Sequence, residues 1–280
     1  MVFMKRTEKI MVSVIIPTKN SAKTLPLCLE SIRKQTHSPL EIIVVDNYSD
    51  DDTRKIAMNY GARVLLKGNE RSAQVNYGVD HAKGKYVYRV DSDVIVEPDV
   101  VAQAVKVCEL HGYHGVIIQI MSDPTISLWS KVRSFERGNF YLYDTHVAVR
   151  FVRRNVFIDL GGFDEKLAAF EDYDFHNRFV RKGYRYARIS SKEKHLGEPK
   201  TLTEIVRKHY YYGKYLRVFI QKNASLRVIR QLSPARIAYL SSIHLLLRNP
   251  KILAAFPIYQ ITRYLASGFG LLSSFVSKRF

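Results

Sequence analysis

The stretch KYVYRVDSDVIVEPD, residues 85–99, carries the pattern from which the fold can be predicted. An aromatic and β-branched run leads into Asp91 and Asp93, which only Ser92 separates, and the apolar run then resumes. Such a run is typical of a buried strand. We therefore interpret residues 85–93 as a strand that ends at two carboxylates.

The two aspartates predict a cation site. Residues i and i+2 of a strand point to one face, and two carboxylates there repel each other unless a cation or a proton lies between them. Carboxylate oxygens suit Mg²⁺ or Mn²⁺, which also bind substrate phosphates. The alternative is that DSD only caps the turn that follows, since Asp is common there.

Outward from this stretch, apolar strands alternate with helices at short spacing. We expect strands at 12–17, 40–46, 63–66, 85–93 and 115–120, and helices at 24–36, 47–61, 71–84 and 99–110. This alternation predicts an α/β fold with a mostly parallel sheet covered by helices on both faces. The polar segments PTKN, DNYSDDDT and DSD follow the first, second and fourth strands, so we expect all three at one edge, where such sheets bind ligands.

The middle of the chain is less regular. We expect a helix at 127–144, a strand leading to a turn at 145–157, and a loop, an acidic cluster, a helix and a strand within 161–190. The acidic cluster is FEDYDF at 170–175. Helical spacing places Asp172 and Asp174 on different faces, so one can face a cleft and the other solvent. A carboxylate in the cleft could accept a proton as a general base, whereas the alternative is that the acidic residues only favour the start of a helix.

Four further positions are candidates for binding. Asp46 ends the second strand, where a carboxylate can bind a base or a ribose, although it can equally form an Asx turn. Arg71 precedes a helix and could reach phosphate. His195 could complete a metal site. The segment TEIVRKHYYYGKYLR at 203–217 mixes basic residues with tyrosines, so it could contact a diphosphate or an acceptor, or face a membrane; from it we select Arg207, Tyr211 and Lys214.

Together these segments resemble the family-2 inverting glycosyltransferases, which have the GT-A fold. The matching segments, in the order of the family, are VSVIIPTKN at 12–20, EIIVVDNYSDDDT at 41–53, Arg71 with the helix after it, DSD at 91–93, GGFDE at 161–165 and FEDYDF at 170–175. The sequence departs from the family at Ser21, where many members have an acidic residue, and it contains no QxxRW.

The resemblance implies a role for each matching residue. Donor binding would involve Pro17, Thr18, Asn20, Asp46, Arg71, Asp91 and Ser92. Asp93 would bind Mg²⁺ or Mn²⁺, with Asp91 and His195 as further metal ligands. Asp172 would be the general base, and Glu171 would contact the acceptor or the diphosphate. The implied reaction is a single displacement with inversion.

Charge is concentrated near the end of the sequence. Residues 201–280 hold 13 of the 44 Lys and Arg but only one of the 26 acidic residues, Glu204. Such a block favours an anionic partner. We therefore expect a catalytic domain over 1–217 and a basic, apolar helical segment over 218–280, associated with the cytoplasmic face of the cell membrane.

The apolar part of this segment is not a clean membrane span. We expect an apolar helix at 234–248, which is too short to cross a bilayer. Residues 252–276 are long enough but contain Pro257 and Arg263, and an Arg near the bilayer centre costs on the order of 3 kcal/mol. We expect both to lie in the membrane interface, close to a lipid-linked acceptor. The alternative is a helical subdomain that packs on the catalytic domain or on a second subunit, as in a homodimer.

Two other functions are alternatives to a glycosyltransferase. A sugar-phosphate nucleotidylyltransferase also uses an α/β sheet with acidic metal ligands, but PTKNSAKTL is not its glycine-rich basic loop. A nucleic-acid-binding module would explain the charge but not the converging polar strand ends, so we expect no nucleic acid partner. A UDP-sugar and GDP-mannose both fit Asp46, and we expect a hexose donor. Cys28 and Cys108 form no CxxC pair, which favours a reducing compartment.

Overall fold

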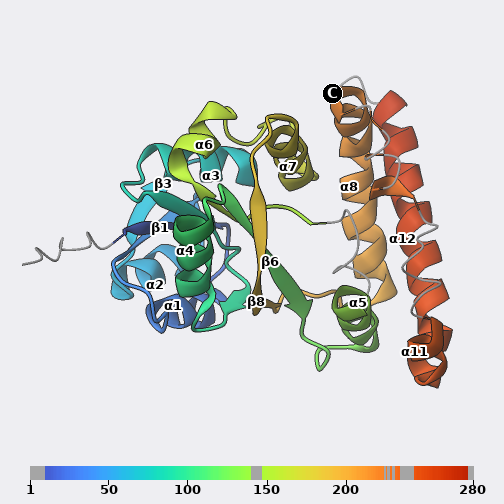
Figure 1. Cartoon of the computed structure of the whole chain (residues 1–280). Coiled ribbons are helices and arrows are strands. Elements are labelled where there is room, and N and C mark those ends of the chain that lie inside the picture. Colours follow the sequence, from blue (N-terminus) through green and yellow to red (C-terminus); the bar gives the residue numbers. More distant parts are fainter. Residues whose placement is uncertain are drawn as a thin grey trace, which may run out of the picture.

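The computed structural model describes residues 10–139, 147–223, 225, 228, 231–233 and 243–276 (Figure 1). The strands are β1 Val12–Thr18, β2 Leu40–Asp46, β3 Arg63–Leu66, β4 Tyr86–Arg89, β5 Val94–Val96, β6 Gly115–Ser122, β7 Phe151–Arg153 and β8 Tyr186–His195. The helices are α1 Leu25–Arg33, α2 Thr53–Asn59, α3 Arg71–Asp80, α4 Val100–His111, α5 Leu128–Asn139, α6 Arg154–Asp159, α7 Glu171–Arg181, α8 Leu202–Asn223, α11 Ile243–Leu247 and α12 Pro250–Val276.

The eight strands form one mixed sheet in the order β3-β2-β1-β4-β7-β6-β8-β5. Strands β1 to β4 pair in parallel, as expected for β-α-β units, and β6 pairs in parallel with β8. The pairs β4–β7, β6–β7 and β5–β8 are antiparallel. The expected α/β fold is therefore confirmed, with one topological difference: β7 separates the fourth strand from β6.

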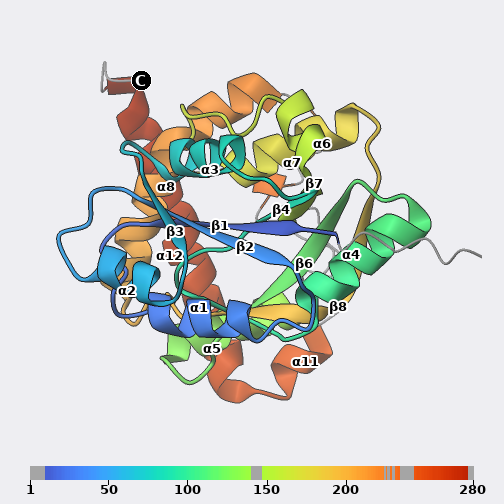
Figure 2. The same cartoon turned by 90° about the vertical axis from the view of Figure 1, so that its left-hand side faces the viewer.

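Helices cover both faces of the sheet because its central strands β1 and β4 are buried on both sides. One core joins the sheet to α1, α2 and α4 and includes Leu29, Ala57 and Cys108. The other joins it to α3, α6 and α7 and includes Val79 and Phe175. Figure 2 shows these two groups of helices on opposite sides of the strands.

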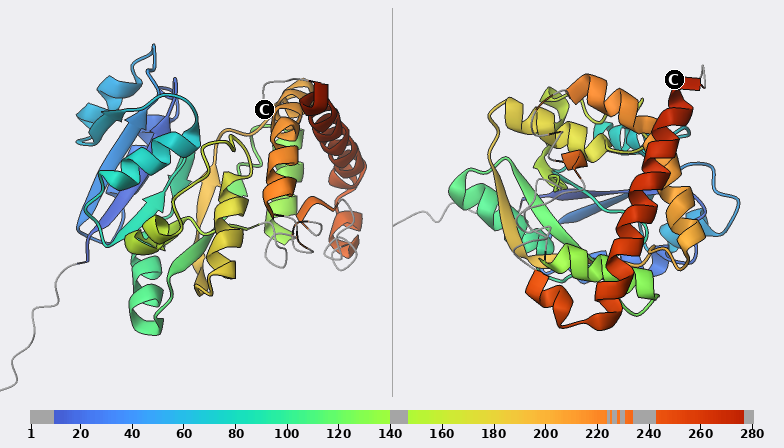
Figure 3. Two further views of the ribbon diagram at one scale, coloured as in Figure 1. Left: turned by 90° about the horizontal axis from the view of Figure 1, so that it is seen from above. Right: turned by 90° about the vertical axis from the view of Figure 1, so that its right-hand side faces the viewer.

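A third layer lies beyond β6 and β8 and consists of α5, α8 and α12 (Figures 1 and 3). Helices α8 and α12 run side by side in close contact. A Cβ at Gly213 would lie 2.2 Å from the Ser267 carbonyl oxygen, and one at Gly270 would lie 2.1 Å from that of Tyr210. Glycine at both positions therefore allows this close packing. An apolar cluster that includes Val132, Ile205 and Phe256 joins the three helices.

The strand expected over 85–93 is shorter in the structure. Strand β4 ends at Arg89, the Val94 amide donates to the Asp91 carbonyl oxygen in a turn, and Val94–Val96 form the separate strand β5. The β-branched residues on both sides of the turn made one strand look continuous. The two aspartates therefore lie in a turn, and the argument that they share one face of a strand was wrong.

Other expected elements also differ in extent. The turn expected near 157 is the helix α6, and the helix expected at 127–144 is described only to Asn139. Most of the helix expected at 234–248 lies outside the described residues. Helix α12 continues through Pro257, and α8 continues through residue 217, so the division into 1–217 and 218–280 stays a prediction. Within the described ranges, no helix combines the length and hydropathy that crossing a membrane would need.

Candidate active site

The loops after β1 and β2 are tied together by Asp46. One oxygen, Oδ1, accepts hydrogen bonds from Thr18 Oγ1 at 2.9 Å and Ser49 Oγ at 2.5 Å, and Oδ2 accepts from the Ser49 amide at 2.8 Å. Asn20 joins the same loops, since its amide donates to Ser49 Oγ and its Oδ1 accepts from the Asp50 amide. These bonds fix the edge of the sheet where β1 and β2 end.

The predicted donor residues at this edge are not equally accessible. Asn20 is exposed, whereas Pro17, Thr18 and Asp46 are buried, and Asp46 is 0% exposed. In this arrangement Asp46 orders the loop and does not present its carboxylate to a ligand. The accessible side chain nearby is Tyr48, which is 57% exposed and has a positive φ of 49°. Sequence reasoning missed Tyr48, because no local pattern signals its backbone conformation.

Asp91 faces three arginines. Its Oδ2 accepts from Arg150 Nη2 at 2.9 Å and Arg89 Nη2 at 3.1 Å, and Oδ1 lies 3.7 Å from Arg71 Nη1. Burial opposes ionisation of Asp91, yet the three guanidinium groups hold its pKa well below the usual range. Sequence reasoning missed Arg89 and Arg150, which lie on two neighbouring segments of the sheet.

Glu171 belongs to the same network of charges. Its Oε1 accepts from Arg71 Nη2 at 2.5 Å and Arg89 Nη1 at 3.3 Å, and the side chain is 1% exposed. Burial raises its pKa, against the effect of Arg71. The expected contact of Glu171 with an acceptor or a diphosphate is therefore not available; Glu171 holds Arg71 and Arg89 instead.

Asp172 is the more accessible carboxylate of the acidic cluster. It is half-buried at the start of α7, and its Oδ1 accepts a hydrogen bond from the Tyr173 amide. The preceding residue, Phe170, has a positive φ of 66°, a conformation that costs free energy for a residue other than glycine. Its ring stacks on Phe219 of α8, with the ring centroids 5.2 Å apart. This packing holds the start of α7, and so Asp172, in place.

Asp93 and His195 come together although 102 positions separate them in the sequence. His195 Nε2 lies 3.3 Å from Asp93 Oδ2. On the other side of the ring, Nδ1 lies 2.9 Å from Glu198 Oε1, which also accepts from Arg137 Nη1 at 2.7 Å and Ser122 Oγ at 2.6 Å. If Nδ1 donates to Glu198, a neutral ring presents its Nε2 lone pair to the Asp93 carboxylate.

This pair fits a divalent cation. A nitrogen and a carboxylate oxygen 3.3 Å apart can bind one cation at neighbouring coordination positions, whereas without a cation a proton on Nε2 would stabilise the contact. A carboxylate bound to the far nitrogen of a ligating histidine is the usual support of such a ligand. Gly197 makes the arrangement possible, because a Cβ there would lie 1.9 Å from Asp93 Oδ2. Among the described residues no group of three His, Cys, Asp or Glu is placed to hold a metal, so the expected set with Asp91 is not assembled.

Helix α8 passes close to this edge of the sheet. The Tyr211 hydroxyl donates to Glu70 Oε1 at 3.1 Å, next to Arg71. Lys214 instead lies over the Tyr210 ring, with Nζ 5.0 Å from its centroid, and Arg207 is exposed. Of the three residues selected from α8, the structure thus brings Tyr211 to the network of charges.

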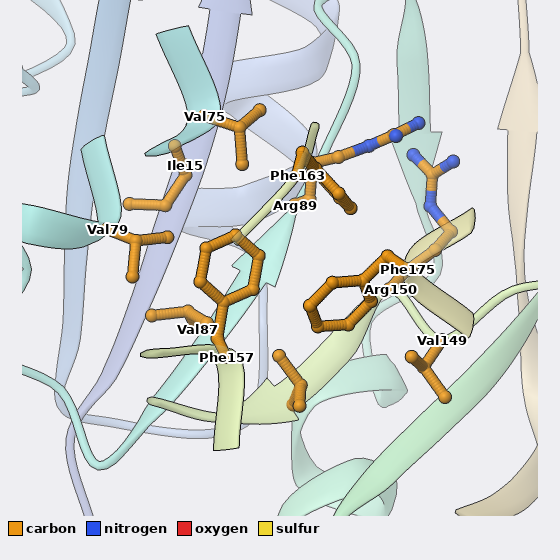
Figure 4. Close-up of a pocket in the computed structure, with 11 residues that line it drawn as sticks. Ile15, Val75, Val79, Val87, Arg89, Val149, Arg150, Phe157, Phe163 and Phe175 are labelled. Atoms are coloured by element: carbon orange, nitrogen blue, oxygen red, sulfur yellow. The ribbon is translucent and has the colours of Figure 1, made fainter. Parts of the chain in front are cut away.

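An enclosed hollow behind the arginines is too small for a substrate. It has a volume of about 10 Å³, and apolar side chains that include Ile15, Val79 and Phe157 line it. Figure 4 shows the guanidinium groups of Arg89 and Arg150 turned away from these apolar residues. A volume of this size corresponds to about one water molecule. The hollow therefore cannot hold a nucleotide or a sugar.

Comparisons with known proteins identify the family of the chain. A family model described as glycosyl transferase family 2 matches residues 13–181. A PGL/p-HBAD biosynthesis glycosyltransferase of Mycobacterium tuberculosis is 30% identical over 177 residues, which cover 60% of this chain and 69% of the relative. An uncharacterized glycosyltransferase of Rickettsia typhi is 27% identical over 187 residues, covering 61% of this chain and 59% of that protein.

Two solved structures show the same fold. The mannosyltransferase PcManGT from Pyrobaculum calidifontis, in complex with GDP-Man and Mn²⁺, has a TM-score of 0.61 at 17% identity and covers 98% of this chain and 77% of its own. TarS from S. aureus, in complex with UDP-GlcNAc, has a TM-score of 0.57 at 19% identity and covers 93% of this chain and 75% of its own. At these identities the likeness concerns the fold.

Proposed function

The chain belongs to glycosyl transferase family 2, and from that premise we propose that it transfers a hexose, with inversion, from a nucleoside-diphosphate sugar to an acceptor hydroxyl or phosphate. The observation that carries the proposal is the Asp93–His195 pair at the edge where the loops after β1, β2 and β4 meet. A pair of this kind suits the metal that accompanies a diphosphate. The family assignment displaces the nucleotidylyltransferase and nucleic-acid-binding alternatives.

Donor binding would use the exposed groups of this edge. Asn20 and the Tyr48 ring can contact the nucleoside, and Arg71, which is about one-third exposed, can reach the diphosphate. Asp93 and His195 would hold Mg²⁺ or Mn²⁺, with Glu198 fixing the imidazole. A divalent cation there would supply positive charge to the departing diphosphate. A UDP-sugar and GDP-mannose remain the two donor classes proposed.

Asp172 would act as the general base. Its carboxylate would take the proton from the acceptor hydroxyl as the acceptor oxygen forms a bond to the anomeric carbon. The bond from that carbon to the diphosphate breaks, and its electron pair leaves on the nucleoside diphosphate. Asp172 is accessible to an acceptor, whereas Glu171 is buried against two arginines, and this difference supports the choice of Asp172.

The acceptor would be lipid-linked and presented at a membrane. The basic composition of residues 201–280 supports this part of the proposal, because anionic headgroups and a phosphate-linked lipid both attract such a segment. An acceptor that is already an ionised phosphate would need less from a base. The protein would then be peripheral or monotopic on the cytoplasmic face of the membrane.

The test separates donor binding from transfer. Thermal-shift measurements with UDP-sugars and GDP-mannose, with and without Mn²⁺, should identify one donor that stabilises the protein more when Mn²⁺ is present. The variant Asp172→Asn should bind this donor with unchanged affinity but transfer sugar at least about a thousandfold more slowly.

The exposed carboxylate of Glu165 in the nearby loop offers a control, since Glu165→Gln should retain transfer. Near-normal turnover by Asp172→Asn would overturn the assignment of the base. The absence of stabilisation by any nucleotide sugar would overturn the proposed donor class.

A further inference from the structure

The surface of α12 is apolar along nearly its whole length. Every exposed residue between positions 253 and 276 is apolar. They are Leu253, Ala254, Pro257, Ile258, Ile261, Leu265, Phe269, Leu272, Phe275 and Val276. Several of the large ones are well exposed, with Phe269 and Leu272 at 63% each. An apolar surface of this extent is unusual on a protein in water and indicates a binding face.

The charged residue within this stretch points the other way. Arg263 is 7% exposed, and its Nη1 lies 3.3 Å from Glu136 Oε1 of α5. Gln260 also donates to Glu136. Arg263 and Gln260 thus face the protein, and the cost of an Arg in a lipid environment does not apply to the exposed face.

The face is broad, which distinguishes it from a coiled-coil seam. At 3.6 residues per turn, its ten residues spread over an arc of about 160°. A seam between two helices uses a narrower stripe, and charged residues beside it fix the partner. Within the described part of α12, no exposed charged residue follows Lys251. An arc of this width suits a helix partly immersed in an apolar phase.

Basic residues lie at both ends of the face. Arg248 and Lys251 are exposed at the start of α12, and the Arg217 guanidinium of α8 lies 4.7 Å from the centroid of the Phe275 ring. With one acidic residue in positions 201–280, this part of the molecule is complementary to an anionic surface. Helix α12 also lies outermost in the molecule, on the side of α8 away from the sheet (Figures 1 and 3).

We propose that the exposed face of α12 binds the interface of an anionic lipid bilayer, with the helix lying parallel to the membrane plane. The apolar side chains enter the boundary between headgroups and acyl chains, and the basic residues contact the headgroups. This inference goes beyond the proposed transfer reaction, because membrane binding by α12 does not depend on the residues that would bind the donor. Membrane binding also orients the molecule, since α8, which contacts Glu70 at the sheet edge, packs on the inner side of α12.

The experiment measures binding of the full chain to vesicles by flotation. Phosphatidylcholine vesicles that contain phosphatidylglycerol should bind the protein, and vesicles of phosphatidylcholine alone should bind it more weakly, with the difference reduced by salt. The double variant Leu265→Gln/Phe269→Gln should bind anionic vesicles about a hundredfold more weakly, because two large apolar side chains no longer leave water.

A matched control removes equally exposed apolar side chains elsewhere. Met58 in α2 and Leu110 in α4 are 59% and 66% exposed, and Met58→Gln/Leu110→Gln should bind vesicles as the unchanged protein does. Equal loss in both double variants, or no binding by the unchanged protein, would overturn the proposal. So would a lipid-free dimer that the α12 variant converts to a monomer, since the face would then bind a second copy.

Donor binding provides the independent readout. Both double variants should keep the stabilisation by a nucleotide sugar that the unchanged protein shows. Vesicle binding without donor binding would contradict the proposed transfer reaction and leave the lipid face intact. Donor binding without vesicle binding would contradict the lipid face and the proposed membrane location, and leave the transfer reaction intact.

Discussion

The edge of the sheet and the layer of α5, α8 and α12 both bury arginines against carboxylates. They differ in whether every oxygen of these carboxylates has a hydrogen-bond partner. At the edge, Asp91 Oδ1 and Glu171 Oε2 are buried without a hydrogen-bond partner, beside Arg71. In the helical layer, both oxygens of Glu136 are engaged, by Arg133 and Arg263. A buried polar atom without a partner costs about 1–3 kcal/mol.

The difference indicates that the network at the sheet edge serves binding and that the network in the helical layer serves folding. Incomplete pairing is a cost that a bound ligand can offset, and Arg71, which is partly exposed beside Asp91 and Glu171, is the group of this network that a ligand can reach. Complete pairing is expected where a network only joins helices. Two adjacent residues of α5 show the division most directly: Glu136 binds Arg263 of α12, and Arg137 binds Glu198, which supports His195.

The largest effect is expected from Glu136→Gln in the helical layer. Removing this charge leaves Arg133 and Arg263 buried without their anion, so the free energy of unfolding should fall by about 3 kcal/mol or more. Urea denaturation measures it. The exposed pair of Glu30 with Lys34 is the control, and Glu30→Gln should cost less than about 1 kcal/mol. Equal costs for the two variants would remove the distinction between a buried network and a surface pair.

A smaller but more specific effect is expected from Glu198→Gln at the sheet edge. Without its anion, His195 is held less firmly, and Mn²⁺ affinity measured calorimetrically in the presence of a nucleoside diphosphate should fall about 10–100-fold. Asp123→Asn is the matched control, because Asp123 pairs with Lys194 instead of His195. Folded Glu136→Gln should keep its Mn²⁺ affinity. An unchanged affinity in Glu198→Gln would mean that Glu198 has no part in metal binding.

The smallest effect is expected in the pH dependence of stability. Burial, with Arg263 of α12, Arg133 of α5 and neighbouring Lys208, lowers the pKa of His209 to about 2, against the effect of Glu136. Below about pH 6.5 the unfolded chain binds a proton at this residue that the folded chain does not, so stability falls as the pH falls. The contribution is at most about 1.4 kcal/mol per pH unit.

The measurement compares the unchanged protein with His209→Gln between pH 6.5 and pH 4.5. The variant should lose less stability over this interval. If the stability of both proteins fell equally over this interval, His209 would take up its proton in the folded state. The helical layer would then be open to water at this residue.

The sequence predicted the elements well because the strands are apolar and the helices are bounded by glycine and polar residues. It also predicted that Asp93 and His195 belong together, but only through the resemblance to a family. The turn after Asp91 was not predictable, since valines and isoleucines continue on both sides of it. Arg89 looked like one polar residue inside a strand, and its partner Glu171 lies 82 positions away.

Charged residues near the end of the chain were the hardest to interpret. Glu198 stands among lysines in KEKHLGEPK, which is typical of a solvated loop, yet its side chain is 2% exposed. Arg263 looked like an obstacle to membrane contact, because nothing nearby in the sequence indicates Glu136 as its partner. Both roles depend on contacts with α5, which a local pattern cannot report.

Gly197 has a consequence for recognising related proteins. Asp93 Oδ2 fills the space that a methyl group at position 197 would need. The tetrapeptide His-Leu-Gly-Glu at 195–198 and the Asp at 93 should therefore occur together in related sequences. A genome search for this arrangement would use H-x-G-E about one hundred positions after D-x-D. A homologue with a larger residue at the glycine must place its aspartate differently, which would mark it as a member with another metal geometry.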